Sequence, residues 1–298
     1  MDRITYIYCP CCGSDDIHEK LSATDYTVSK EQFAIWHCNT CSVRFTQNIP
    51  DQSLIGKYYQ SENYISHTDT KKGLVNSLYH IVRKRTLRHK EQLIKYFTAI
   101  LKGDLLDIGA GTGAFASHLK NAGWNVVGVE PDESTRRLAF ELHDISLQTA
   151  EDLFKFPPAS FDAVTMWHVL EHVHALHEYL EQINIILKLT GKAFIAVPNY
   201  TSYDGELYKE YWAAYDVPRH LYHFSPRAMR LLIEKHGMKV EAIQPMWYDS
   251  FYVSMLSEQY KTGEPGNVTA AINGLLSNIN AVGNHKKCSS LIYIIRKV

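Results

Sequence analysis

The spacing of apolar positions changes along the chain, and these changes divide it into three parts. Apolar residues recur at helical spacing across residues 74–101, which predicts a long helix. From residue 105 onward, short apolar runs alternate with amphipathic stretches, as strands alternate with helices around a parallel sheet. The chain before residue 74 shows neither pattern over any length. The sequence therefore predicts an α/β fold, a three-layer sandwich around a mostly parallel sheet, preceded by a small module of short strands and turns.

The expected elements of the α/β part follow one another closely. Strands are expected at residues 105–108, 125–129, 161–166, 193–197, 238–243 and 290–298. Helices are expected at residues 114–122, 133–142, 177–187 and 226–236. Two segments, 199–225 and 246–285, interrupt the alternation, and both are longer than a plain connection needs. We expect them to be insertions on the substrate side, and the first is rich in aromatic side chains.

Composition and charge narrow the choice of partners. The 298 residues include 31 Lys and Arg against 32 Asp and Glu, so the net charge is −1 and there is no global basic field for nucleic acid. The apolar runs are far shorter than the ~20 residues that span a bilayer, and the start has no apolar stretch of signal-peptide length. We expect a soluble, cytoplasmic protein. Residues 50–73, which are polar and rich in Tyr, Ser and Asp, are expected to form a linker or lid.

Five of the six cysteines lie within the first 41 residues. Two Cys-x-x-Cys pairs, 25 residues apart, approximate the spacing of a zinc ribbon, and the alternative is a set of reduced cysteines buried as small apolar groups. A module of ~50 residues buries little surface on its own, so zinc would supply much of its folding free energy. We therefore predict a zinc-ribbon-like module at residues 1–49, with Cys11 as a bystander. The predicted ligands of a structural Zn²⁺ are Cys9, Cys12, Cys38 and Cys41.

A glycine-rich turn follows the first strand of the α/β part. Gly109, Gly111 and Gly113 alternate between an apolar run and a helix, so a ligand could lie against bare backbone at the helix N-terminus. This spacing, with Glu130 about 20 residues on, also satisfies the loose fingerprint of NAD enzymes. However, Asp107 would repel a pyrophosphate and attract a cationic amino group. The turn therefore favours a cofactor with an ammonium group and a ribose but no phosphate.

Four motifs in register identify a family resemblance. They are Leu-Asp-Ile-Gly-Ala-Gly-Thr-Gly, Val-Gly-Val-Glu-Pro, Ser-Phe-Asp-Ala-Val and Val-Leu-Glu-His-Val, all within residues 104–198. Together they resemble the class I S-adenosylmethionine-dependent methyltransferases. The resemblance implies a Rossmann-like domain over residues 74–298 with a seven-stranded, mostly parallel sheet whose last strand is antiparallel. It also implies S-adenosylmethionine as cofactor and S-adenosylhomocysteine as product.

The resemblance implies roles for residues along the carboxyl edge of this sheet. The glycine turn would line the methionine moiety, Asp107 would fix its amino end, and Glu130 would bind the ribose hydroxyls. Thr149 stands where the family often has an aspartate, so backbone contacts are expected at the adenine. The implied cofactor-binding residues are Asp107, Gly109, Ala110, Gly111, Gly113, Glu130, Pro131, Ala150, Glu151 and Trp167.

Histidines after the fourth and fifth strands are the candidates for proton transfer. His168, Glu171 and His172 also match the pattern of inverted zinc metalloproteases, but they directly follow a strand, where the methyltransferase resemblance places an active-site loop. One or both histidines could instead only brace this loop. A base near neutral pH suits methyl transfer to a hydroxyl. The predicted catalytic residues are His168, His172, His220 and His223.

The aromatic insert at residues 199–225 narrows the resemblance to a subgroup of the family. Its motif, a Trp followed by Asp-x-Pro-Arg-His-x-x-His-Phe, is similar to sequences of ubiquinone-type O-methyltransferases and zinc-containing sugar C-methyltransferases. We predict methyl transfer to a small-molecule acceptor, with O-methylation favoured and C-methylation of a nucleotide-linked sugar as the alternative. A ribosomal RNA methyltransferase, or a non-catalytic nucleic-acid binder using the ribbon, is the rival. Acidic residues outnumber the basic ones in residues 1–49, which argues against it. Nothing in the pattern indicates an oligomeric state.

Overall fold

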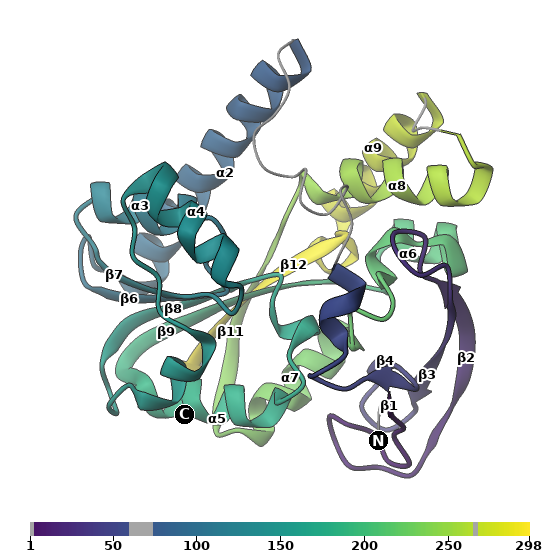
Figure 1. Ribbon diagram of the computed structural model, residues 1–298, viewed down its shortest axis with the longest axis horizontal. Coiled ribbons are helices and arrows are strands. Elements are labelled where there is room, and N and C mark those ends of the chain that lie inside the picture. Colours follow the sequence, from purple (N-terminus) through teal and green to yellow (C-terminus); the bar gives the residue numbers. More distant parts are fainter. Residues whose placement is uncertain (1–2, 60–73, 265–267) are drawn as a thin grey trace.

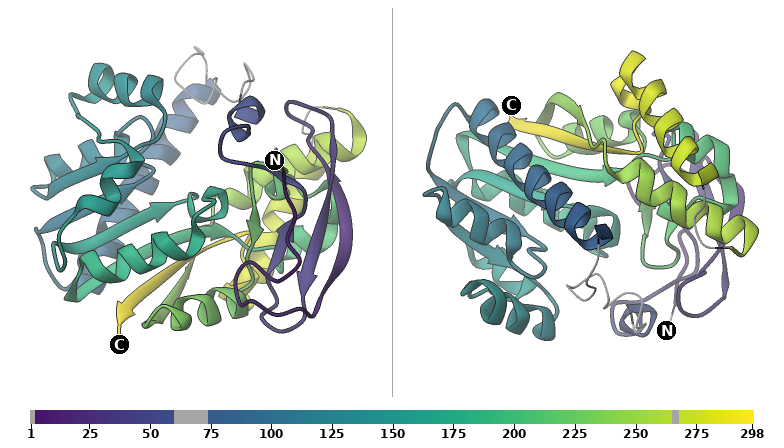
Figure 2. Two further views of the ribbon diagram at one scale, coloured as in Figure 1. Left: turned by 60° about the horizontal axis from the view of Figure 1, so that its bottom comes forward. Right: turned by 90° about the horizontal axis from the view of Figure 1, so that it is seen from above.

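A computed structural model describes residues 3–59, 74–264 and 268–298 of the chain. In Figure 1 a central sheet lies between helices, and a smaller sheet-containing module formed by the N-terminal residues stands at one end of it. The two further views in Figure 2 show the same side-by-side arrangement. The α/β class predicted from the sequence is confirmed.

The central sheet contains six strands among the described residues. Their order is β11-β12-β9-β8-β6-β7. β6, β7, β8 and β9 pair in parallel, while β12 is antiparallel to both of its neighbours, β9 and β11. The antiparallel last strand agrees with the prediction. The strands are β6 (Asp104–Ile108), β7 (Asn125–Val129), β8 (Phe161–Trp167), β9 (Leu187–Pro198), β11 (Met238–Pro245) and β12 (Ser290–Lys297).

The predicted count of seven strands is wrong for the described residues. The missing strand would lie outside β7, and there the chain forms only one parallel bridge, between Gln148 and Val129. Gln148 exchanges hydrogen bonds with Gly128 and Glu130. Thr149 then caps a 3-10 helix (Ala150–Lys155), and both its backbone N–H and its hydroxyl donate to Asp152 at 3.0 Å. This capping box turns the chain before a strand can extend.

Alternating side chains of the buried strands face two layers of helices. Leu105 and Phe194 belong to the core shared with α2 and α3, whereas Leu106 and Ile195 face the core shared with α5 and α7. Ser225 caps α7 by accepting from the N–H of Ala228 at 3.1 Å. The helices are α2 (Leu74–Thr98), α3 (Ala114–Asn121), α4 (Glu133–His143), α5 (Leu176–Ile186) and α7 (Pro226–Lys235).

The N-terminal module consists of two small sheets, and one of them takes a strand from far along the chain. The larger sheet has the order β10-β4-β3-β2, and the smaller pairs β1 with β5. Tyr222 in β10 lies opposite Phe45 in β4. The aromatic insert and the N-terminal module therefore share one sheet. The strands are β1 (Arg3–Ile4), β2 (Ile17–Thr24), β3 (Gln32–Cys38), β4 (Arg44–Thr46), β5 (Ile49–Pro50) and β10 (Tyr222–His223).

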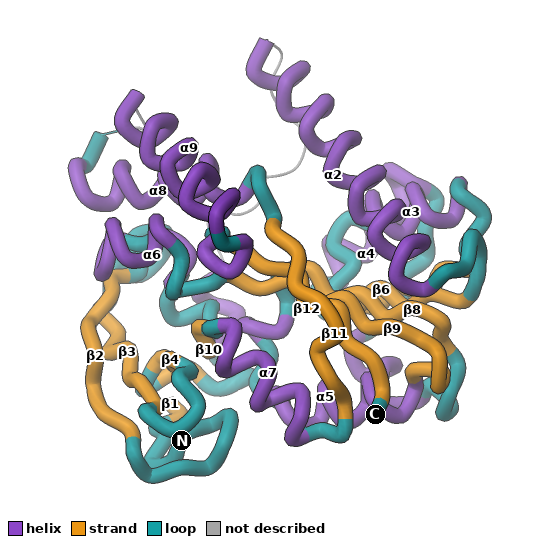
Figure 3. Tube along the Cα trace, turned by 180° about the vertical axis from the view of Figure 1, so that it is seen from behind, coloured by secondary structure: helices purple, strands orange, loops and turns teal. Residues whose placement is uncertain are grey.

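Helices form much of the two segments that interrupt the alternation. The first holds α6 (Tyr203–Tyr208), and the second holds α8 (Asp249–Thr262) and α9 (Val268–Gly283), which lie side by side in Figure 3. A Cβ added at Gly274 of α9 would lie 2.9 Å from the Cα of Phe251, so only glycine permits this close packing. No helix of the described ranges has the length and apolar character needed to cross a membrane. The predicted linker is described only as far as Tyr59, within a 3-10 helix (Ile55–Tyr59), and residues 60–73 lie outside the described ranges.

Candidate active site and metal centre

The glycine turn leaves an open space at the carboxyl edge of the sheet. Gly109, Gly111 and Gly113 have φ values of +70°, +53° and +75°, which glycine adopts without strain. A Cβ at Gly109 would lie 2.3 Å from Val169 Cγ2, so a side chain at this position would clash with Val169. A Cβ at Gly111 would meet nothing within 4 Å. The turn therefore exposes backbone to a space that a ligand can fill.

Two buried carboxyl groups flank this turn. Asp107, 1% exposed, accepts a hydrogen bond from the hydroxyl of Thr165 at 2.6 Å, and burial raises its pKa to about 6. Glu130, at the end of β7, accepts from the N–H of Gly111 at 2.9 Å and from that of Asp132 at 3.2 Å. Burial also raises the pKa of Glu130. Carboxylates in these places can bind an ammonium group and hydroxyls, and they would repel a phosphate.

The other predicted cofactor-binding residues lie along the same edge of the sheet. Ala110 donates its N–H to the carbonyl of Val129 at 3.0 Å. Pro131 follows Glu130, and Ala150 and Glu151 open the 3-10 helix after the single bridge to β7. Trp167 ends β8. Because β6, β7 and β8 are parallel neighbours, the topology brings all ten predicted residues to one edge.

A lysine from α2 reaches this edge, which the sequence did not reveal. The ammonium of Lys90 lies 4.1 Å from the ring centroid of Trp167 and 5.6 Å from that of Phe115. Burial lowers its pKa to about 8, although the charges of Asp107 and Asp249 oppose this change. Lys90 also lines a cavity of about 190 Å³ together with Trp247 and Asp249. Lys90 is therefore not part of a solvated basic face of α2.

His168 lies between two carboxylates immediately after β8. Its Nδ1 atom is 3.3 Å from Oε1 of the buried Glu171, and its Nε2 atom is 3.0 Å from Oδ2 of Asp249. Burial lowers the pKa of His168, but the hydrogen bonds and charges of Asp249 and Glu171 outweigh it and raise the pKa to about 10. The two carboxylates therefore favour the protonated imidazole. No sequence signal pointed to Asp249, because it follows β11 in a segment without a motif.

Two of the remaining predicted histidines join this group, and the third lies elsewhere. The rings of His172 and His220 meet edge to face with centroids 4.5 Å apart. Burial and the charge of His220 lower the pKa of His172 to about 4, so His172 is neutral. His223 instead lies in β10, where its Nε2 atom is 3.1 Å from the hydroxyl of Thr46 and its ring packs on Tyr215. It contacts the N-terminal module.

The four predicted cysteine ligands converge in the N-terminal module. One sulfur atom from each lies within 4.8 Å of the others, and Cys9–Cys41 and Cys12–Cys38 have sulfur distances of 3.6 Å. Sulfur atoms at about 2.3 Å from a tetrahedral zinc ion stand about 3.8 Å apart, so this arrangement fits the metal. Cys11 is buried and lies outside the four-sulfur group.

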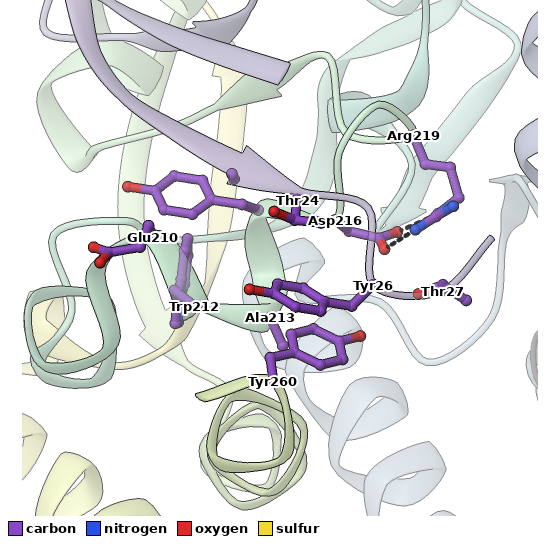
Figure 4. A pocket seen from close by; sticks show the side chains of 11 residues that line it. Thr24, Tyr26, Thr27, Glu210, Trp212, Ala213, Asp216, Arg219 and Tyr260 are labelled. Atoms are coloured by element: carbon purple, nitrogen blue, oxygen red, sulfur yellow. Dashed lines mark hydrogen bonds and ion pairs between the residues drawn. The ribbon is translucent and has the colours of Figure 1, made fainter. Parts of the chain in front are cut away.

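A small hollow lies between the N-terminal module and the aromatic insert (Figure 4). Tyr26 stacks on Tyr260 with centroids 4.4 Å apart, and Arg219 binds Asp216 through two hydrogen bonds. The volume of the hollow, about 10 Å³, is room for about one water molecule. It is a packing gap rather than an acceptor site.

Known proteins are similar to this chain over the region that contains the glycine turn and the histidine cluster. The family described as "Methyltransferase domain" matches residues 80–243. The mitochondrial ubiquinone biosynthesis O-methyltransferase of Homo sapiens is 26% identical over 165 residues, which cover 49% of this chain and 44% of that protein. The ubiquinone biosynthesis O-methyltransferase of Xanthomonas euvesicatoria is 25% identical over 159 residues, which cover 49% and 66%. The chain thus spans about half the length of the first of these relatives.

A solved structure shares the fold. It is the phosphoethanolamine N-methyltransferase 2 of Haemonchus contortus in complex with S-adenosyl-L-methionine, with a TM-score of 0.52 and 16% identity. The match covers 85% of this chain and 62% of that one. At this identity the match concerns the fold alone, and it agrees with the Rossmann-like arrangement expected from the four motifs.

Proposed function

Because this chain belongs to the methyltransferase domain family, we propose that it transfers the methyl group of S-adenosylmethionine to a hydroxyl group of a small acceptor. The observation that carries the proposal is the open space over Gly111 between the carboxylates of Asp107 and Glu130. S-adenosylmethionine, when bound, supplies an electrophilic methyl carbon on a sulfonium. Asp107 would bind its ammonium group and Glu130 its ribose hydroxyls.

The choice of a hydroxyl acceptor rests on the relatives and on the histidines. Both curated relatives described above are named as O-methyltransferases. A hydroxyl loses its proton as the methyl group arrives, and His168 is our candidate to accept it. A proton taken up by His168 is stabilised by Glu171 and Asp249 on either side. The same carboxylates favour the protonated imidazole, so His168 must release its own proton to solvent before it can accept one from the acceptor, and the positive charge of the cofactor would favour this release.

We also assign a structural Zn²⁺ to Cys9, Cys12, Cys38 and Cys41, since the distances between their sulfur atoms fit a closed tetrahedral site. The proposed module boundaries are residues 1–49 for the ribbon and 74–298 for the methyltransferase domain. The ribbon would act on the reaction only indirectly, because β4 holds β10 of the aromatic insert.

Calorimetry with S-adenosylmethionine, S-adenosylhomocysteine and NAD tests the cofactor. We expect the first two to bind and NAD not to bind, and binding of NAD alone would overturn the proposal. A screen of phenols, quinols and nucleotide sugars with the wild-type protein then tests the acceptor. Product analysis by NMR identifies the atom that gains the methyl group. Methylation of a sugar carbon, or of RNA with salt-sensitive affinity, would replace the hydroxyl assignment.

A further inference from the structure

A second group of metal-binding side chains lies beside the proposed methyl-transfer site. Glu171 and His172 come from the turn after β8 (Leu170–His172), and His220 comes from the aromatic insert. One potential ligand atom from each lies within 4.8 Å of the others. The pattern seen in the sequence paired Glu171 and His172 with His168. The fold instead places His220 with them, and it leaves His168 bound to the other oxygen of the carboxylate.

The carboxylate of Glu171 has one oxygen without a partner. Its side chain is fully buried, and its Oε1 atom lies 3.3 Å from Nδ1 of His168. Its Oε2 atom is buried and has no hydrogen-bond partner among the residues that the structure describes. A buried carboxylate oxygen left unpaired is costly. Among the described residues this oxygen is therefore free to bind a ligand.

Both histidines are oriented as metal ligands are. Nδ1 of His172 lies 3.0 Å from the hydroxyl of Tyr59 and 3.1 Å from the carbonyl oxygen of Arg219, and Nδ1 of His220 lies 2.8 Å from that of Ala214. A ring N–H that donates to a carbonyl places the lone pair on Nε2, which is the usual outer-shell arrangement around a metal-bound histidine. Nε2 of His220 is also 3.9 Å from Asp216, whose carboxylate is held by two hydrogen bonds from Arg219.

We propose that Glu171, His172 and His220 bind a divalent transition-metal ion, with Zn²⁺ as the reference ion. Two imidazoles and one carboxylate form the ligand set of catalytic zinc sites and leave coordination positions open. Ligand atoms at about 2.0–2.2 Å from a tetrahedral ion stand roughly 3.3–3.6 Å apart, so modest side-chain rotations close the site around the ion. The unpaired oxygen of Glu171 is then satisfied.

The position of this site gives the ion a role in the reaction, and this step rests on the proposed function. The residue before the turn that carries Glu171 and His172, Val169, packs on the glycine turn, so an ion held there would lie near the proposed cofactor space. A metal ion lowers the pKa of a bound hydroxyl and orients it. The ion would select acceptors with an oxygen atom that can bind it, such as a phenol with a neighbouring oxygen substituent.

The test is calorimetric titration of ZnCl₂ into full-length protein whose ribbon already holds zinc, with no cofactor or acceptor present. We expect one further binding site in the wild type. Glu171→Gln and His220→Gln should each weaken it at least about tenfold. His118→Gln is the matched control, since His118 pairs with Glu91 outside both clusters, and it should bind like the wild type. Circular dichroism of each variant checks that the fold is kept.

Two results would overturn the metal site. One is the absence of any zinc binding beyond the ribbon in the wild type. The other is unchanged affinity in both Glu171→Gln and His220→Gln with the fold intact. Titration of S-adenosylmethionine into the same samples separates this proposal from the proposed function, because loss of the metal site alone leaves cofactor binding in place.

Discussion

At the scale of single residues, the burial of Asp107 raises the pKa of a carboxyl group that we propose binds the cofactor. Its carboxyl group is buried beneath the glycine turn, where its partners are the hydroxyl of Thr165 and the charges of Lys90 and Glu130. Its pKa of about 6 means that it is ionised above pH 6 and neutral below. Only the ionised form attracts an ammonium group. If Asp107 binds the ammonium group as proposed, the affinity for S-adenosylmethionine should depend on the protonation of this carboxyl group.

We expect the affinity for S-adenosylmethionine to fall by up to about tenfold per pH unit below pH 6. Asp107→Asn should weaken binding roughly 10- to 100-fold at pH 8 and flatten the profile, since it removes a charge-assisted hydrogen bond. Calorimetry at pH 5 to 8 measures both. An Asn variant that kept the wild-type slope would assign the titration to another group.

His168 gives a second prediction at this scale. His168→Ala should lower turnover by roughly 10²–10⁴-fold, the usual contribution of a general base, while cofactor affinity changes by only about a few-fold. Asp249→Asn is the comparison, because it leaves the imidazole in place and should lower turnover less. Rates under saturating acceptor and calorimetry with S-adenosylmethionine provide the two readings. Loss of cofactor binding in His168→Ala would place His168 in the cofactor site.

The candidate site was predictable where its residues are close in sequence. The glycine turn with Asp107 requires only a strand followed by glycines, and the cysteine pairs carry their own spacing. The approach of Lys90 and Asp249 to Trp167 and His168 was not predictable. These four side chains come from α2, α8 and the end of β8, and only the tertiary packing of three elements joins them.

At the scale of elements, the four-cysteine cluster should behave as one cooperative unit. Cys9→Ser should leave the protein with about one zinc ion per chain fewer than the wild type and with a lower melting temperature, because metal binding supplies folding free energy. Cys11→Ser should keep the metal, since its sulfur lies outside the four-sulfur group. Elemental analysis and thermal unfolding test this pair. Equal metal loss in both variants would show that the ligand set is different.

The strands of the central sheet were predictable because each is a short apolar run of its own. Residues 105–108 and 125–129 were expected as strands, and they lie in β6 and β7. The missing outer strand was not predictable, since the capping box of Thr149 and Asp152 competes locally with pairing to β7. The pairing of β10 with β4 was also not predictable, because strands of two or three residues are too short to show an alternation of apolar and polar residues.

At the scale of the whole molecule, the side chain of Arg219 connects the N-terminal module to the aromatic insert. It is 1% exposed and binds Asp25 of the module at 3.0 Å, Asp216 of the insert at 2.6 Å and the carbonyl of Tyr58 at 2.8 Å. Two carboxylates on one buried guanidinium connect three distant segments of the chain. Removal of the guanidinium leaves both carboxylates without their cation.

Arg219→Ala should lower the free energy of unfolding by about 3–5 kcal/mol, the range for breaking a buried ion pair. Arg227→Ala is the control. Its exposed guanidinium donates to the carbonyl of Thr40 on the same interface, and its loss should change stability by about 0.5 kcal/mol. Urea unfolding followed by tryptophan fluorescence gives both values. Equal effects of the two substitutions would contradict the role of Arg219.

The sheet shared by β4 and β10 also has a consequence for the order in which a ribosome makes the protein. Phe45 and Tyr222 are partners in this sheet, but they lie 177 positions apart in the sequence. At 5–20 residues per second, β10 is synthesised roughly 10 to 35 s after β4. During this interval the edge of β4 that faces away from β3 is unpaired, and an unpaired edge can join other chains. The sheet of the N-terminal module is thus completed only after β10 has been translated.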